Sequence, residues 1–156
     1  MGTSRSYERI VMDLINEDRL ELQVDPAQWD VLIRRSAALL ERDRVIDARY
    51  VDAVFDSIRR NGSYMVIVPR VLLAHARPEE GALGTGLSLV TPRTDAPLDG
   101  DPAMPIRMFF TLATTDSETH LDLIAHLATV LVDEQLLAEL ATSADTARVA
   151  QILEPT

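Results

Sequence analysis

The stretch from residue 63 to residue 91 constrains the fold more than any other part of the chain. Apolar runs lie on both sides of a polar elbow, His75-Ala-Arg-Pro-Glu79, and are bounded by glycine and proline. Short apolar runs without clear polar alternation are typical of buried β-strands. Pro78 holds Arg77 in an extended conformation and has no amide hydrogen, so the elbow cannot continue as a helix. The sequence therefore predicts a histidine in a loop held by stiff strands, where functional groups often lie.

Predicted strands and helices alternate along the rest of the chain. Strands are expected at residues 20–24, twice within 63–75, at 84–91 and at 106–113. Helices are expected to begin after N-cap residues at five places: Asp25, Asp47, Asp116 or Ser117, Asp133 and Ser143. This alternation predicts the α/β class, as a layered sandwich with a central mixed β-sheet flanked by helices.

We expect one domain at residues 19–154, preceded by an N-terminal lead at residues 1–18, because a chain of 156 residues suits a single core. The lead is expected to be mobile or helical, since its apolar residues have helical spacing: Tyr7, Ile10, Val11, Leu14 and Ile15. The same spacing predicts the buried face of the helix that follows Asp116: Leu121, Ile124, Ala125, Ala128 and Leu131.

The composition excludes several kinds of chemistry. The chain has no cysteine, which excludes disulfides, zinc–thiolate sites and thiol catalysis. It has no lysine, which excludes a Schiff-base or P-loop lysine. The net charge of −10 argues against binding to nucleic acid or anionic membranes. No apolar run approaches the ~18 residues of a membrane-spanning helix, and the N-terminus has no signal-peptide core, so we expect a cytoplasmic protein without membrane insertion.

The elbow and its surroundings resemble a known family. The residues that carry the resemblance are Asn61-Gly62, His75-Ala-Arg-Pro-Glu79 and Thr85-Gly-Leu-Ser-Leu-Val90. They are similar to the enzyme IIA component of the phosphoenolpyruvate-dependent sugar phosphotransferase system (PTS EIIA type 2, the mannitol/fructose class), most of all to its ascorbate-type branch. The resemblance extends from about residue 20 to about residue 152. Ala74 stands where the family usually has proline, which loosens the backbone before the histidine but removes no reacting atom.

The resemblance implies a phosphocarrier. His75 would accept a phosphoryl group from the carrier protein HPr and pass it to a cysteine of enzyme IIB, a separate chain that works with a membrane permease. His120, within Glu118-Thr-His-Leu121, would support the phosphorylated histidine as a donor, and Arg59 would stabilise the phosphate. The choice of Arg59 over Arg60 rests on the resemblance alone. The resemblance implies no metal and no organic cofactor.

General chemistry agrees with a histidine in this role. Imidazole, with an ordinary pKa near ~6.5, can attack phosphorus through one ring nitrogen while a hydrogen bond fixes the other. The phosphorylated site then needs donors, because it gains up to about two negative charges. Arg77 is a second candidate, since side chains two residues apart in an extended segment tend to share a face. His126 follows His120 on the same predicted helix and faces another side, so the two cannot form a metal pair.

Several alternatives stay open at this level. The chain is either a transport component for an ascorbate-like sugar or a regulatory module that binds partners according to its phosphorylation state, as a monomer or a homodimer. A metal-dependent hydrolase built on His75 and His120 needs about three converging ligands, and the usual metal motifs are absent. An apolar docking patch around His75 would draw on some of four leucines, the others being core residues: Leu72, Leu73, Leu83 and Leu87.

Overall fold

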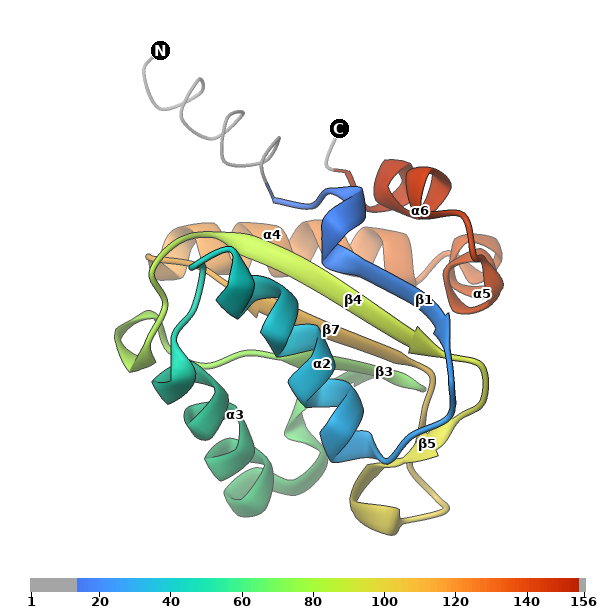
Figure 1. The fold of residues 1–156 in the computed structure, drawn as a ribbon, viewed down its shortest axis with the longest axis horizontal. Helices are drawn as coiled ribbons and strands as arrows, with labels where there is room; N and C mark the ends of the chain where they lie inside the picture. The colour runs from blue at the N-terminus through green and yellow to red at the C-terminus, as the bar shows by residue number, and fades with distance from the viewer. Residues whose placement is uncertain (1–13, 155–156) are drawn as a thin grey trace.

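The computed structural model describes residues 14–154, which contain a five-stranded mixed sheet in the order β1-β4-β7-β3-β2 (Figure 1). Its strands are β1 (Leu20–Val24), β2 (Val66–Val68), β3 (Val71–Ala74), β4 (Gly86–Pro92) and β7 (Met108–Ala113). The pairs β1/β4 and β3/β7 are parallel, whereas β4/β7 and β2/β3 are antiparallel. Two further strands pair with each other, β5 (Ala96–Pro97) and β6 (Pro105–Ile106). The prediction of a mixed central sheet is confirmed.

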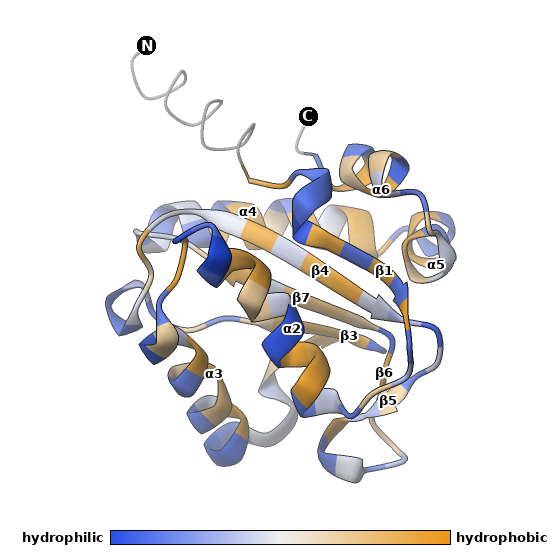
Figure 2. Ribbon diagram, viewed as in Figure 1, coloured by the Kyte–Doolittle hydropathy of each residue, from blue (hydrophilic) through white to orange (hydrophobic). Residues whose placement is uncertain are grey.

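Helices cover both faces of the sheet (Figure 1). One face carries α2 (Trp29–Arg42) and α3 (Ala48–Asn61), and the other carries α4 (Ser117–Leu131), α5 (Glu134–Thr142) and α6 (Thr146–Leu153). Side chains alternate between the faces along a strand, so neighbouring residues fill different cores. Phe109 packs in the core beneath α2 and α3, whereas Phe110 packs in the core beneath α4 to α6. In Figure 2, α3 is apolar toward the sheet and polar away from it.

Three of the predicted helix starts are confirmed as N-caps: Asp47, Asp116 and Asp133. The other two are wrong. Asp25 does not cap α2, which begins at Trp29 with Gln28 at the N-cap position; Asp25 pairs with Arg93 instead. Ser143 does not cap α6, because the Asp145 carboxylate accepts the hydrogen bond from the first turn of that helix.

The predicted buried face of α4 is right at Leu131, partly right at the half-buried Ile124, and wrong at its other three residues. The buried residues are Leu123, Leu127, Val130 and Leu131. Leu121 is 67% exposed, and Ala125 and Ala128 are exposed as well. The helix carries apolar residues on more than one side, so its sequence spacing fits two phases. Packing against the sheet, α5 and α6 selects the phase.

The end of the predicted lead packs onto the domain. Leu14 and Ile15 are buried, and the Leu14 carbonyl accepts hydrogen bonds from Leu87 N and Arg19 Nη1. The other apolar residues of the predicted lead helix lie outside the described residues: Tyr7, Ile10 and Val11. No helix within residues 14–154 is both long enough and apolar enough to cross a membrane.

Gly81 fixes the end of the elbow against α3. Its carbonyl accepts a hydrogen bond from Asp47 N at 3.0 Å, and its φ of +122° is rare for residues with a side chain. An added Cβ would overlap the Asp47 carboxylate and lie 2.7 Å from Tyr50 N.

We therefore expect Gly81→Ala to lower the free energy of unfolding by about 2 kcal/mol more than Gly62→Ala does. Gly62 is the matched control, because its φ of +60° is also positive but nothing lies within 4 Å of its added Cβ. The measurement is urea unfolding of both variants. Equal losses would show that the elbow tolerates the clash.

Candidate functional site

His75 directly follows the last residue of β3, an inner strand that lies between β7 and β2. Its Nδ1 lies 2.8 Å from the Leu73 carbonyl oxygen. A carbonyl oxygen only accepts hydrogen bonds, so Nδ1 carries the proton and the Nε2 lone pair is free. The hydrogen bond also fixes the plane of the ring, because its donor and acceptor are only two residues apart at the end of β3. This is the arrangement that a nucleophilic imidazole requires.

Tyr50 of α3 holds the backbone on the other side of His75. Its buried hydroxyl accepts a hydrogen bond from Ala76 N at 2.9 Å and donates one to Leu112 O at 2.6 Å. Burial raises the pKa of Tyr50 to about 12, so the hydroxyl keeps its proton. The elbow is thereby tied both to α3 and to β7.

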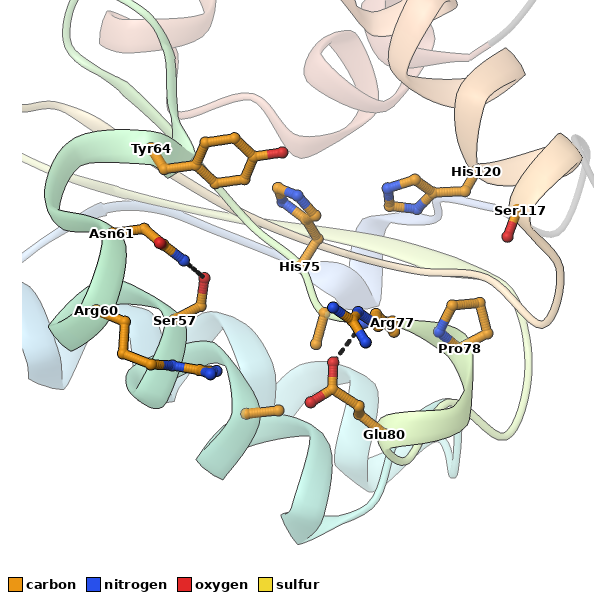
Figure 3. Close-up of a pocket in the computed structure, with 12 residues that line it drawn as sticks. Ser57, Arg60, Asn61, Tyr64, His75, Arg77, Pro78, Glu80, Ser117 and His120 are labelled. Carbon is orange, nitrogen blue, oxygen red and sulfur yellow. Dashed lines mark hydrogen bonds between the residues drawn. The ribbon is translucent and has the colours of Figure 1, made fainter.

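A pocket of about 740 Å³ opens beside His75 (Figure 3). It is bounded by the end of α3, the 3₁₀ turns η2 (Gly62–Met65) and η3 (Pro78–Glu80), the elbow and the first turn of α4. Its lining includes nine polar or aromatic side chains that can contact a ligand: Ser57, Arg60, Asn61, Tyr64, His75, Arg77, Glu80, Ser117 and His120. Sequence analysis assigned no site role to Ser57, Asn61, Tyr64 or Ser117; Asn61 entered only through the family resemblance and Ser117 only as a possible N-cap, and the fold brings all four together.

The structure brings the two predicted histidines together. The ring centroids of His75 and His120 are 5.3 Å apart, and the rings are tilted by 44°. In Figure 3 the His120 ring reaches from α4 toward His75. Burial lowers the pKa of His120, and repulsion from the His75 imidazole lowers it further. His120 is therefore a neutral ring at pH 7, able to donate one hydrogen bond.

Two arginines line the pocket, Arg60 from α3 and Arg77 from the elbow, whereas Arg59 does not. Arg59 pairs with Asp56 on the exposed side of α3. Arg60 and Asn61 lie on the side of α3 that lines the pocket, and Arg59 lies outside that side. Neither Arg60 nor Arg77 forms an ion pair with any residue in the described range 14–154. Their charges are available to an anionic ligand.

Three of the four leucines considered for a docking patch belong to the core, as was expected of some of them. Leu72, Leu73 and Leu87 are each at most 2% exposed, because β3 and β4 are covered on both faces. Leu83 is exposed, at 55%. Of the large exposed apolar or aromatic side chains in the described residues, Tyr64 lines the pocket beside His75.

His126 lies away from the pocket, and its Nε2 is 3.4 Å from the Leu153 carbonyl oxygen of α6. Within the described part of the chain, no group of three or more His, Asp and Glu side chains is placed to hold a metal ion.

The lowered pKa of His120 predicts a pH dependence of stability. Below its ordinary value of 6.5, the unfolded chain binds a proton at His120 more readily than the folded chain does. Stability is therefore lost as the pH falls from that value toward the lower folded pKa. We expect His120→Gln to lose less free energy of unfolding than the wild type between pH 7 and pH 5, measured by urea unfolding at both pH values. An equal loss in the two proteins would contradict the assignment.

Comparisons with known proteins agree on one family. Residues 13–155 match the family described as phosphoenolpyruvate-dependent sugar phosphotransferase system, EIIA 2. An ascorbate-specific PTS system EIIA component of Escherichia coli strain K12 is 31% identical over 123 residues, which cover 78% of this chain and 80% of that protein.

Solved structures have the same fold. The mannitol-specific cryptic phosphotransferase enzyme IIA of Escherichia coli superposes with a TM-score of 0.78 at 28% identity, covering 94% of this chain and 98% of that one. A chain in the complex of enzyme IIAMTL and phosphorylated enzyme IIBMTL from Escherichia coli superposes with a TM-score of 0.77 at 19% identity, covering 89% and 96%.

Proposed function

Because the chain belongs to the EIIA 2 family of the phosphoenolpyruvate-dependent sugar phosphotransferase system, whose members are phosphotransferase components, we propose that it carries a phosphoryl group on His75. One observation carries the assignment to this residue. The hydrogen bond from His75 Nδ1 to Leu73 O makes Nε2 the nitrogen that carries the lone pair in the neutral ring, beside a pocket that holds two arginines without carboxylate partners among the described residues.

The proposed reaction is two successive displacements at phosphorus. Nε2 of His75 attacks the phosphorus atom of phospho-HPr, a new N–P bond forms, and the electron pair of the broken bond returns to HPr. The thiolate of a cysteine on enzyme IIB then attacks the same phosphorus, and Nε2 recovers its lone pair. The cysteine belongs to another chain, because this one has none. Neither step moves the Nδ1 proton, so the hydrogen bond to Leu73 O holds the ring throughout.

The pocket supplies donors for the phosphoryl group. We assign charge stabilisation to Arg60 and Arg77, since arginine binds phosphate oxygens with fixed geometry, and Arg60 replaces Arg59 in this role. His120 donates a further hydrogen bond. The negative charge of the phosphoryl group would raise the pKa of His120 again and strengthen that bond. A neutral donor before phosphorylation avoids a permanent third cation, which would hold the group too firmly for transfer.

The proposed partners are HPr as donor and enzyme IIB, with its membrane permease, as acceptor. A protein with this fold has been solved in complex with phosphorylated enzyme IIB, which supports the second partner. We propose an ascorbate-like sugar as the cargo, on the 31% identity to an ascorbate-specific component. Enzyme IIA passes on a phosphoryl group only, so the sugar is selected by the partner.

The test is a reconstituted relay with the full chain, enzyme I, HPr and labelled phosphoenolpyruvate. We expect about one acid-labile phosphate per chain, as for any phosphohistidine, and its transfer to an added ascorbate-type enzyme IIB in preference to a mannitol-type one. An acid-stable label contradicts the phosphohistidine. A label that forms on the chain but passes to neither enzyme IIB favours the regulatory module instead.

A further inference from the structure

Tyr64 is an exposed aromatic residue that the relay described above does not use. It lies in the turn η2, between Gly62, with a φ of +60°, and the buried Met65. Met65 is 2% exposed and anchors the turn, whereas Tyr64 is 67% exposed. The Tyr64 ring is therefore accessible to a ligand that enters the pocket.

Tyr64 and His120 lie on opposite sides of the His75 ring (Figure 3). The Tyr64 and His75 ring centroids are 6.0 Å apart with a tilt of 45°, and the His75 and His120 centroids are 5.3 Å apart with a tilt of 44°. Both separations are within the range of aromatic contacts. His75 is therefore flanked by two rings that each carry a polar group, and in Figure 3 both side chains point toward it.

The Tyr64 hydroxyl has no hydrogen-bond partner among the residues that the structure describes. Of the five large apolar or aromatic side chains that are exposed in residues 14–154, Tyr64 is the one that lines the pocket; the others are Val31, Leu83, Leu121 and Val132. The hydroxyl is thus a free donor at the edge of a pocket that contains two arginines.

We propose that the Tyr64 hydroxyl donates a hydrogen bond to a phosphoryl oxygen on His75, opposite the donor from His120. This rests on the proposed function, because it requires a phosphoryl group on Nε2. A phenol suits the position because it is neutral and bonds an anion less strongly than a guanidinium does. It stabilises the phosphorylated state moderately, which keeps both forward and reverse transfer accessible.

The test compares Tyr64→Phe with wild type in the equilibrium between phospho-HPr and this chain, using the full-length protein and quenched samples. Tyr64→Phe keeps the ring and removes the hydroxyl, so we expect the equilibrium to shift about tenfold toward phospho-HPr, the size expected for one hydrogen bond to a charged group. The ³¹P resonance of the phosphohistidine should also move. Leu121→Ala is the matched control, because Leu121 is equally exposed, at 67%, but does not line the pocket; it should leave both readouts unchanged.

The outcomes separate this proposal from the one on which it rests. If the wild type takes no label, both are overturned. If the wild type is labelled and Tyr64→Phe matches it in equilibrium constant and ³¹P resonance, the hydroxyl has no such role, and His75 remains the carrier. A change in the KM for HPr alone, with the equilibrium unmoved, would make Tyr64 a docking contact and also overturn the proposal.

Discussion

His75→Ala is expected to take no acid-labile label in the relay, where the wild type takes about one phosphate per chain. The loss should be complete, because the substitution removes the attacking atom. We expect that His120 cannot replace His75 as the nucleophile, although the centroids of the two rings are only 5.3 Å apart. Its Nδ1 is buried without a hydrogen-bond partner among the described residues, so nothing fixes the tautomer as Leu73 O does for His75.

The control for this prediction is His126→Ala, since His126 contacts Leu153 O away from the pocket. It should be labelled like the wild type. Circular dichroism and urea unfolding of His75→Ala should match the wild type closely, because His75 is only half-buried at the end of a strand. Acid-labile label that persists in His75→Ala would place the nucleophile elsewhere.

Arg60→Ala is expected to slow phosphoryl transfer from phospho-HPr by about 100-fold, whereas Arg59→Ala should change the rate by less than about threefold. The two arginines are neighbours on α3 and have the same charge, so long-range attraction of a partner affects both variants alike. Their side chains have different surroundings: that of Arg60 lines the pocket, and that of Arg59 pairs with Asp56.

The measurement is the single-turnover rate of labelling at saturating phospho-HPr, which separates transfer from binding. A large effect of Arg59→Ala, or none of Arg60→Ala, would reverse the assignment of the phosphate-binding arginine. Equal moderate effects that disappear at high salt would indicate steering of the partner in place of contact with the phosphoryl group.

Local signals in the sequence were sufficient for most elements of the fold. Asp47, Asp116 and Asp133 each stand before a helix as an N-cap, a motif that acts within about one turn. Asp25 and Ser143 carry the same signal, but neither caps a helix: Asp25 pairs with a residue far along the chain, and Ser143 is displaced by a nearby competitor. Arg93 pairs with Asp25 across 68 residues, and Asp145 offers a competing cap two residues after Ser143.

For the site, the sequence by itself determined a histidine in the elbow between apolar runs, the proline that keeps the elbow extended, and the family that these residues resemble. The tertiary structure decided which side chains surround that histidine. Arg60, and not Arg59, lines the shared pocket from α3. The rings of Tyr64, from η2, and His120, from α4, lie beside the His75 ring. The physical reason is that a strand end fixes its own residues through local backbone geometry, whereas the rotation of a helix about its axis is set by packing against a distant sheet.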